Sequence, residues 1–274
     1  MMQTPDSMES KLLRDTFLRD GVVKLSALLA PDDLAGAHSC YNWSLTHLGP
    51  HGSGTSFVSS KGSATFEDKA NPDAPGVYAP WLHATGLTKA ALALWGNSRQ
   101  AWFMYEQVFM KRGASRRTCW HQDSSYLAID GQHLIVFWIC FDAVAESESL
   151  EFVRGSHKGP LYNGSTFNEV DPTEPLYKSG NLPRLPDVDA TPDAFDLVSY
   201  GIEPGDVIAF HPQTLHGGAA THAGAKRETL SIRLFGDDAV FAHRPGPCGP
   251  RVAGLHDALK PGEPFRYPAF VALT

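Results

Sequence analysis

The sequence predicts a mainly β fold, an antiparallel sandwich or barrel preceded by α-helices. From Trp102 onward, apolar residues no longer recur at helical spacing, and β-branched and aromatic segments are separated by Gly, Pro, Asp and Ser. No helical segments alternate with these strands, which argues against a parallel α/β sheet. The chain has 274 residues, 42% of them hydrophobic, and no internal repeat or linker. We therefore expect one domain over residues 1–274, with helices within about 7–98 and the β core within about 102–240.

The first hundred residues carry the helical signals. Leu12, Leu13 and Phe17 recur at helical spacing, and Gly21 follows them as a stop. Residues 49–76 are rich in Gly, Ser, Pro and Asn and predict a long loop, where we place substrate access. The predicted elements of this part are helices over 7–19, 31–48 and 87–95 and a short strand over 22–25.

The rest of the chain is read as strands separated by turns. A second irregular stretch, about 159–199, contains six prolines and interrupts the strands. The predicted strands are 103–110, 120–126, 134–141, 150–153, 206–210, 217–221 and 229–235.

Composition narrows the possible partners. The 23 Lys+Arg against 30 Asp+Glu give a net charge of -7, which disfavours nucleic acid. The longest apolar run, residues 134–141, has eight residues and is too short to span a bilayer, and the polar start does not read as a secretory signal. Four cysteines without a C-x-x-C pair are expected to be reduced thiols. We expect a cytoplasmic protein with no membrane contact.

The strongest local signal is the H-x-D pair of His121 and Asp123. In a strand, residues two apart point to the same face, so this pair presents an imidazole and a carboxylate side by side. A third neutral donor would complete the two-histidine, one-carboxylate arrangement that binds non-haem Fe(II). His211 and His216 both follow a predicted strand, and either could be that donor. Alone, an H-x-D pair is a weak signal, because such short matches arise by chance.

Several segments in a fixed order strengthen the signal. They are 17–23, 120–123, 138–142, 152–157, and 205–217 from its Gly-Asp to its His-Gly. With them the chain resembles the phytanoyl-CoA dioxygenase (PhyH)-like family of Fe(II)/2-oxoglutarate-dependent oxygenases. The resemblance implies a double-stranded β-helix (jelly roll, cupin-like) core with N-terminal and flanking α-helices, and iron held by His121, Asp123 and His216.

The resemblance also implies a site for 2-oxoglutarate. Its distal carboxylate would pair with Arg227, eleven residues after His216, and the family spacing favours this arginine over Arg233. An arginine suits bidentate capture of a carboxylate. By the same resemblance, Gln107 and Trp138 line the 2-oxoglutarate pocket, and Thr229 adds a hydroxyl contact.

Other residues are assigned more simply. His211 is read as a hydrogen-bonding residue at a strand end, and His157 as a turn residue or one that supports a ligand; neither is read as a ligand. Tyr126, Arg233 and the loop at 53–61 are our candidates for substrate contact. A cluster of basic residues precedes the H-x-D pair and consists of Lys111, Arg112, Arg116 and Arg117. It either attracts an anionic substrate or forms a solvated hairpin turn.

The resemblance implies hydroxylation of an unactivated C–H bond of a small-molecule metabolite, using O2 and releasing succinate and CO2. The carboxylate of Asp123 separates the chain from halogenating relatives, which carry a small residue there. The same cofactors could instead drive desaturation, epoxidation or ring rearrangement. A non-catalytic, cupin-like metal sensor is the alternative from another class, and it would have no need of Arg227. The oligomeric state stays open.

Overall fold

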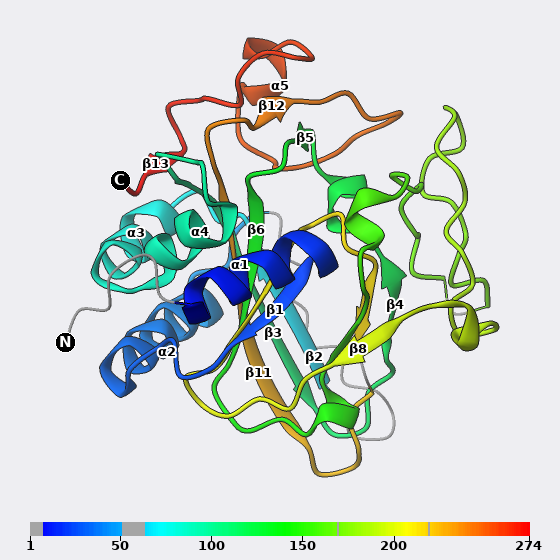
Figure 1. Ribbon diagram of the computed structural model, residues 1–274, viewed down its shortest axis with the longest axis horizontal. Helices are drawn as coiled ribbons and strands as arrows, with labels where there is room; N and C mark the ends of the chain where they lie inside the picture. Colours follow the sequence, from blue (N-terminus) through cyan, green and yellow to red (C-terminus); the bar gives the residue numbers. More distant parts are fainter. Residues whose placement is uncertain (1–7, 51–63, 169, 219) are drawn as a thin grey trace.

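The computed structural model describes residues 8–50, 64–168, 170–218 and 220–274. Two β-sheets face each other, and the helices formed by residues 31–95 lie along one flank of the molecule (Figure 1). The helices predicted over 7–19, 31–48 and 87–95 are confirmed to within two residues. The α-helices are α1 (Met8–Asp20), α2 (Pro31–Thr46), α3 (Ala74–Ala84), α4 (Leu87–Trp95) and α5 (Leu255–Ala258).

The strands form a major sheet in the order β1-β9-β6-β11-β3-β13, with β2 also paired to β3, and a minor sheet in the order β4-β10-β7-β8. All pairings within the two sheets are antiparallel, and β5 pairs with β12 apart from them. The predicted mainly β class with a double-stranded β-helix core is confirmed. The strands are β1 (Val22–Leu25), β2 (Ala64–Lys69), β3 (Trp102–Arg112), β4 (Thr118–His121), β5 (Ile129–Asp130), β6 (Leu134–Cys140), β7 (Leu150–Val153), β8 (Leu197–Ser199), β9 (Val207–Phe210), β10 (His216–Gly218), β11 (Lys226–Phe235), β12 (Val240–Phe241) and β13 (Val271–Ala272).

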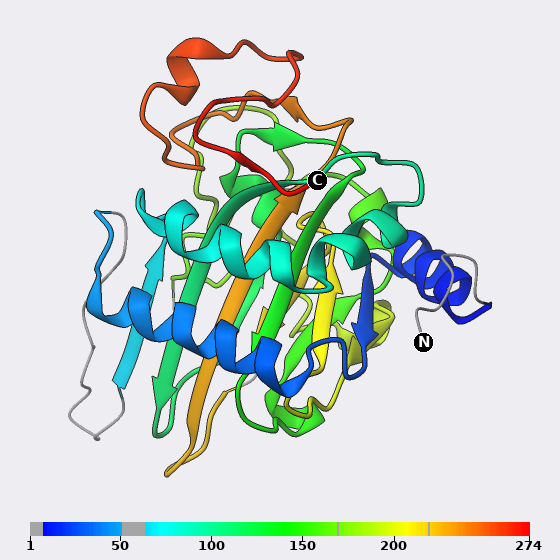
Figure 2. The same cartoon turned by 90° about the vertical axis from the view of Figure 1, so that its left-hand side faces the viewer.

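The central strand β11 has two faces of different chemistry. Leu230, Ile232 and Leu234 point outward and are buried in one apolar cluster with side chains of the helices. Figure 2 shows α2, α3 and α4 lying across this outer face of the major sheet. The alternate residues of β11 point into the space between the sheets and are polar. The helices therefore hold the sheet from outside and leave its inner face for a cavity.

The prediction of a loop over 49–76 is wrong for residues 64–69 and 74–76, whereas residues 49–50 and 70–73 form neither helix nor strand. Residues 64–69 form β2, and α3 begins at Ala74, while 51–63 lie outside the described residues. β2 is a polar edge strand whose hydrogen bonds come from β3, so its sequence carries little apolar pattern. Two prolines, one near the start of α3 and Pro80 inside it, obscured the helical spacing.

Three strands begin or end at residues that differ from the prediction. The strand predicted over 120–126 is wrong beyond His121, because β4 ends there and residues 123–126 form a 3₁₀ turn. The strand predicted from residue 217 begins at His216, and residue 219 is outside the described part. β11 begins three residues before its predicted start at Thr229.

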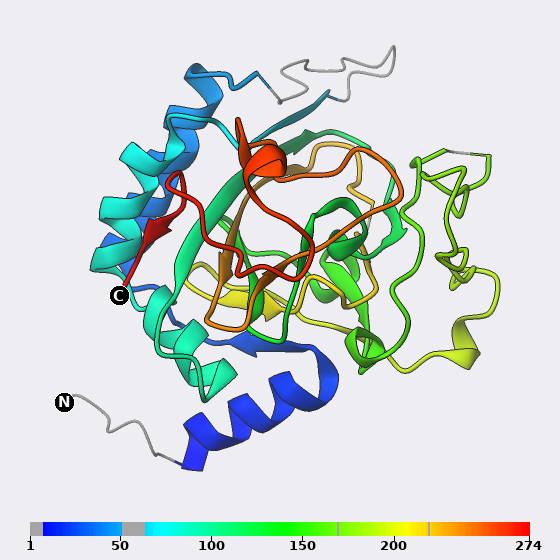
Figure 3. The ribbon, with the colours of Figure 1, turned by 90° about the horizontal axis from the view of Figure 1, so that it is seen from above.

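The irregular stretch over 159–199 is confirmed apart from β8 and a 3₁₀ turn at Pro192–Ala194. It extends on the side of the molecule opposite α2, α3 and α4 (Figure 3). The sequence did not predict β5, β12, α5 or β13, which are all short. Within the described residues, none of the helices has the length and apolar character needed to cross a bilayer.

Glu106 on β3 is a buried carboxyl group near the helical layer. Oε1 accepts the N–H of Asn71 at 2.9 Å, while Oε2 has no hydrogen-bond partner among the described residues. Burial raises the pKa of Glu106 to about 7, against an ordinary value of 4.5 in the unfolded chain. The unfolded state therefore loses this proton at lower pH than the folded state does, and the folded state loses stability as pH rises from about 4.5 to about 7.

We expect Glu106→Gln to remove this pH dependence, because glutamine keeps an acceptor for the Asn71 N–H and carries no charge. At pH ~8 the variant should exceed the wild type in free energy of unfolding by up to about 3 kcal/mol, and near pH ~4 the two should be close. Urea denaturation at both pH values measures this. An equal difference at both pH values would contradict a raised pKa.

Candidate active site

Three potential metal ligands meet where the minor sheet ends. His121 on β4 pairs directly with His216 on β10, and Asp123 opens the 3₁₀ turn that follows β4. Gln122 between them keeps an extended backbone (φ −116°, ψ 127°), so His121 and Asp123 still point the same way, as predicted. Oδ1 of Asp123 lies 3.6 Å from Nε2 of His121 and 4.0 Å from Nε2 of His216.

The main chain orients both imidazoles. Nδ1 of His121 donates to the carbonyl oxygen of Cys119 at 2.8 Å, and Nδ1 of His216 donates to that of Thr214 at 2.9 Å. Each ring therefore presents the lone pair of Nε2 to the centre of the triad. Burial, and then the neighbouring His121, lower the pKa of His216 to about 3. His216 is thus neutral at physiological pH, as a metal ligand must be.

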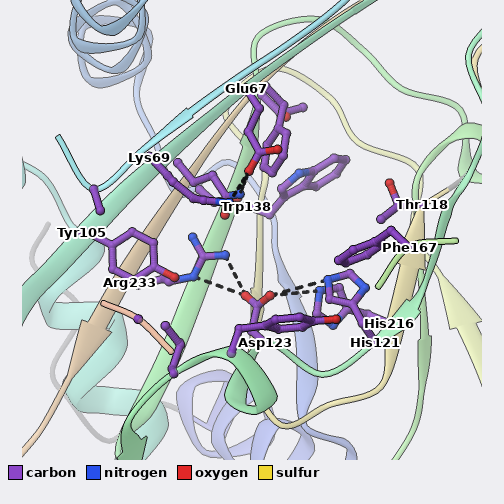
Figure 4. A pocket seen from close by; sticks show the side chains of 18 of the residues that line it. Glu67, Lys69, Tyr105, Thr118, His121, Asp123, Trp138, Phe167, His216 and Arg233 are labelled. Carbon is purple, nitrogen blue, oxygen red and sulfur yellow. Dashed lines mark hydrogen bonds and ion pairs between the residues drawn. The ribbon is translucent and has the colours of Figure 1, made fainter. Parts of the chain in front are cut away.

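Arg233 on β11 fixes the carboxylate. Its Nη2 donates to Oδ2 of Asp123 at 2.7 Å and its Nε to the same oxygen at 3.3 Å, while the ring of Tyr105 packs 4.7 Å from the guanidinium. Figure 4 shows Asp123 between Arg233 on one side and the two histidines on the other. Burial alone would raise the pKa of Asp123, but the charge of Arg233, helped by the histidines, holds it well below its usual range. Asp123 is therefore ionised with Oδ1 turned to the triad.

Between the two sheets lies a cavity of about 720 Å³ with the triad in its wall. The inner face of the major sheet forms rows across three strands. Ser231 on β11 stands between Gln107 on β3 and Trp138 on β6. Thr229, two residues before Ser231, lies on the same face of β11. Arg227 lies at the far end of this face and donates through Nη1 to the carbonyl oxygen of Glu148. All four residues predicted to line the 2-oxoglutarate pocket, Arg227, Gln107, Trp138 and Thr229, line this one cavity.

Two other predicted residues have structural roles. Nε2 of His211 donates to the carbonyl oxygen of Gly131 at 3.1 Å, and its Nδ1 accepts the N–H of Gln213. His157 lies beside His211, with ring centroids 5.6 Å apart, and both are outside the triad. The hydrogen bonds of His211 agree with its interpretation, while Nδ1 of His157 has no hydrogen-bond partner among the described residues.

The irregular segment covers the triad with an aromatic side chain that sequence reasoning missed. Phe167 packs edge-on against His121 at 5.3 Å and stacks on Tyr126 at 5.9 Å (Figure 4). The hydroxyl of Tyr126 donates to the carbonyl oxygen of Ser165 at 2.9 Å, so only the ring of Tyr126 faces the cavity. No local pattern around Phe167 marks it, because its position depends on how residues 159–199 fold back over the sheet.

The donor set fits ferrous iron. Two neutral imidazole nitrogens and one carboxylate oxygen lie within 4.8 Å of one another, and they form the one cluster of potential metal ligands found among the described residues. This is the facial triad of non-haem iron oxygenases, which leaves three coordination positions open for other ligands.

Comparison with known proteins identifies the class. The profile of the family described as phytanoyl-CoA dioxygenase (PhyH) matches residues 17–229, more than three quarters of the chain. The chain belongs to this family of Fe(II)- and 2-oxoglutarate-dependent oxygenases, with His121, Asp123 and His216 as its facial triad. No curated protein sequence matches the chain at a significant level.

Solved structures share the fold at low identity. The epimerase SnoN, in complex with Fe3+, alpha ketoglutarate and nogalamycin RO, superposes with a TM-score of 0.72 at 17% identity, covering 98% of this chain and 100% of SnoN. The alpha ketoglutarate dependent carbocyclase SnoK from nogalamycin biosynthesis gives 0.69 at 18% identity, with both chains fully covered. EctD from S. alaskensis, with 2-oxoglutarate and 5-hydroxyectoine, gives 0.60 at 16% identity, covering 86% of this chain and 78% of EctD.

The Asp123–Arg233 pair makes a testable contribution to stability. We expect Arg233→Met to destabilise the metal-free protein by about 3–5 kcal/mol, because the variant leaves the buried carboxylate without its counter-charge. Adding Asp123→Asn to Arg233→Met should recover most of that loss. Mn(II) should stabilise the single variant more than it stabilises the wild type. Urea unfolding with and without Mn(II) measures these effects, and a single variant as stable as the metal-free wild type would refute the assignment.

Proposed function

We propose that this oxygenase hydroxylates an unactivated C–H bond of a small-molecule metabolite and releases succinate and CO2. One observation carries the proposal: the triad opens into a 720 Å³ cavity whose opposite end holds Arg227. A cavity of this size exceeds what 2-oxoglutarate alone needs and is in the range of sites for drug-sized ligands. The remaining space would receive the substrate.

The inner face of the major sheet supplies the contacts to 2-oxoglutarate in this proposal. Arg227 would take the distal carboxylate and Thr229 would add a hydroxyl contact, with Gln107 and Trp138 as side walls. Glu67 accepts a hydrogen bond from Nε2 of Gln107 at 2.6 Å, which fixes the direction of that amide. When bound to the triad, iron supplies the activation of O2 that is coupled to the oxidative decarboxylation of 2-oxoglutarate.

The substrate would lie under the irregular segment. The ring of Tyr126 and the ring of Phe167 offer an apolar surface next to His121. Arg233 is the polar candidate, because its Nη1 is buried, lines the cavity and has no hydrogen-bond partner among the described residues. These side chains would position a C–H bond near the metal and exclude water from it. The other predicted contact, the loop at 53–61, lies outside the described residues.

A second type of reaction with the same cofactors is favoured by how much of this chain superposes on two of the solved structures. The epimerase SnoN and the carbocyclase SnoK match along at least 98% of this chain, whereas the likeness to EctD covers 86–91%. Epimerisation or ring closure is therefore our second candidate, ahead of desaturation and epoxidation. A cytoplasmic location and a single domain over 1–274 are further proposals, the first supported by four cysteines without a disulfide.

The co-substrate is tested first. Anaerobic protein loaded with Fe(II) is expected to give the weak visible charge-transfer band of the iron–2-oxoglutarate chelate. His216→Ala should abolish the band because it removes a ligand, and Arg227→Ala should shift it to much higher 2-oxoglutarate concentration. Absence of the band in the wild type, despite bound iron, would contradict the proposed function and favour a metal-binding sensor.

The outcome of the reaction is tested by product mass. Candidate substrates are screened by succinate release, and the product is formed under isotopically labelled O2. Hydroxylation adds one labelled oxygen atom, ring closure or desaturation removes two hydrogens, and epimerisation leaves the mass unchanged. We expect the labelled hydroxyl product. A product of unchanged mass would replace the hydroxylase proposal with the epimerase one.

A further inference from the structure

Two cations stand directly opposite each other on the cavity wall. Arg227 on β11 pairs in register with Lys111 on β3, and both residues line the cavity. Alternate residues of each strand point into the cavity. Arg227 shares this inward face of β11 with Thr229 and Ser231, and Lys111 shares the inward face of β3 with Gln107. Side chains directly opposite in an antiparallel pair begin about 5 Å apart, and two like charges so placed destabilise the sheet.

Lys111 differs from the basic residues around it. Arg117 pairs with Glu151 and Asp189, and of the cluster at 111–117 only Lys111 lines the cavity. Nζ of Lys111 donates to the carbonyl oxygen of Arg116 at 3.2 Å, and no carboxylate among the described residues lies within ion-pair distance of it. A neutral carbonyl solvates an ammonium group but does not cancel its charge.

The electrostatics of the pair point to an anion between the two side chains. Burial, and then the charge of Arg227, lower the pKa of Lys111 to about 8, so Lys111 is still mainly protonated at neutral pH. A bound carboxylate would offer one oxygen to each cation and turn a repulsive pair into two charge-assisted hydrogen bonds.

We propose that Lys111 and Arg227 together bind the distal carboxylate of 2-oxoglutarate, so that Lys111 is a specificity residue for a 2-oxo diacid. The proposal rests on the proposed role of Arg227 and adds a second cation to it. An organic-acid substrate could offer the same carboxylate chemistry. The position of Lys111, directly across the strand pair from Arg227, favours the co-substrate, because both side chains can then reach one carboxylate.

The test measures how much Lys111 contributes to recognition of the distal carboxylate. Anaerobic Fe(II)-loaded protein is titrated with 2-oxoglutarate and, separately, with 2-oxobutyrate, which keeps the metal-chelating group and lacks the distal carboxylate. The charge-transfer band gives a dissociation constant for each. Wild type is compared with Lys111→Met and with Arg112→Met. Arg112 is the matched control because it is the next residue of β3, carries the same charge and does not line the cavity.

We expect Lys111→Met to weaken 2-oxoglutarate binding by about tenfold and to leave 2-oxobutyrate binding unchanged. Arg112→Met should match the wild type with both ligands. Because the ratio of the two constants is taken within each variant, a general loss of folding or iron affinity cancels.

Three results would overturn the proposal, and they differ in what they leave standing. An unchanged ratio in Lys111→Met, with a normal band, removes Lys111 and leaves the proposed function intact. If Arg112→Met changes the ratio of the two dissociation constants as much as Lys111→Met does, the effect comes from the overall charge of the protein and not from a binding site. No band in the wild type with either ligand removes the proposed function together with the role of Lys111.

Discussion

The two-residue repeat of β11 controls where the chemistry of this protein lies. Leu230, Ile232 and Leu234 are buried against the helical layer, and a shift of one residue in register would expose all three to the cavity. The register that buries them also points Arg227 and Arg233 inward. The positions of the charged residues are thus set by the packing of their apolar neighbours.

The minor sheet supplies the metal ligands under a different constraint. β10 must approach β4 closely for His216 to stand opposite His121, and a Cβ at Gly217 would lie 3.0 Å from the carbonyl oxygen of Thr118. The glycine after His216 therefore allows the close contact between these two strands. With both histidines on paired strands and Asp123 on the turn that follows, the triad is carried by regular structure held by main-chain hydrogen bonds.

The sequence was sufficient to predict an element where a local pattern of apolar residues determines the structure. Helical spacing predicted α1, α2 and α4, and the unbroken apolar run of residues 134–141 predicted β6. It was insufficient where long-range pairing decides: β2 is a strand because β3 supplies its partners. The bond from Arg233 to Asp123 joins residues 110 positions apart. Phe167 reaches the triad from a segment with no repeating pattern, so nothing local could reveal its place.

The wall of the cavity is of two kinds, and this matters for how such enzymes diverge. The two histidines of the triad and the inner face of the major sheet are parts of paired strands, where most substitutions disturb packing or register. Phe167 belongs to a long segment with little regular structure, which tolerates substitution and changes of length. New substrate preferences can arise through residues 159–196 while the machinery for activating oxygen is inherited unchanged. Exchanging this segment between relatives is the route by which one scaffold would acquire many substrates.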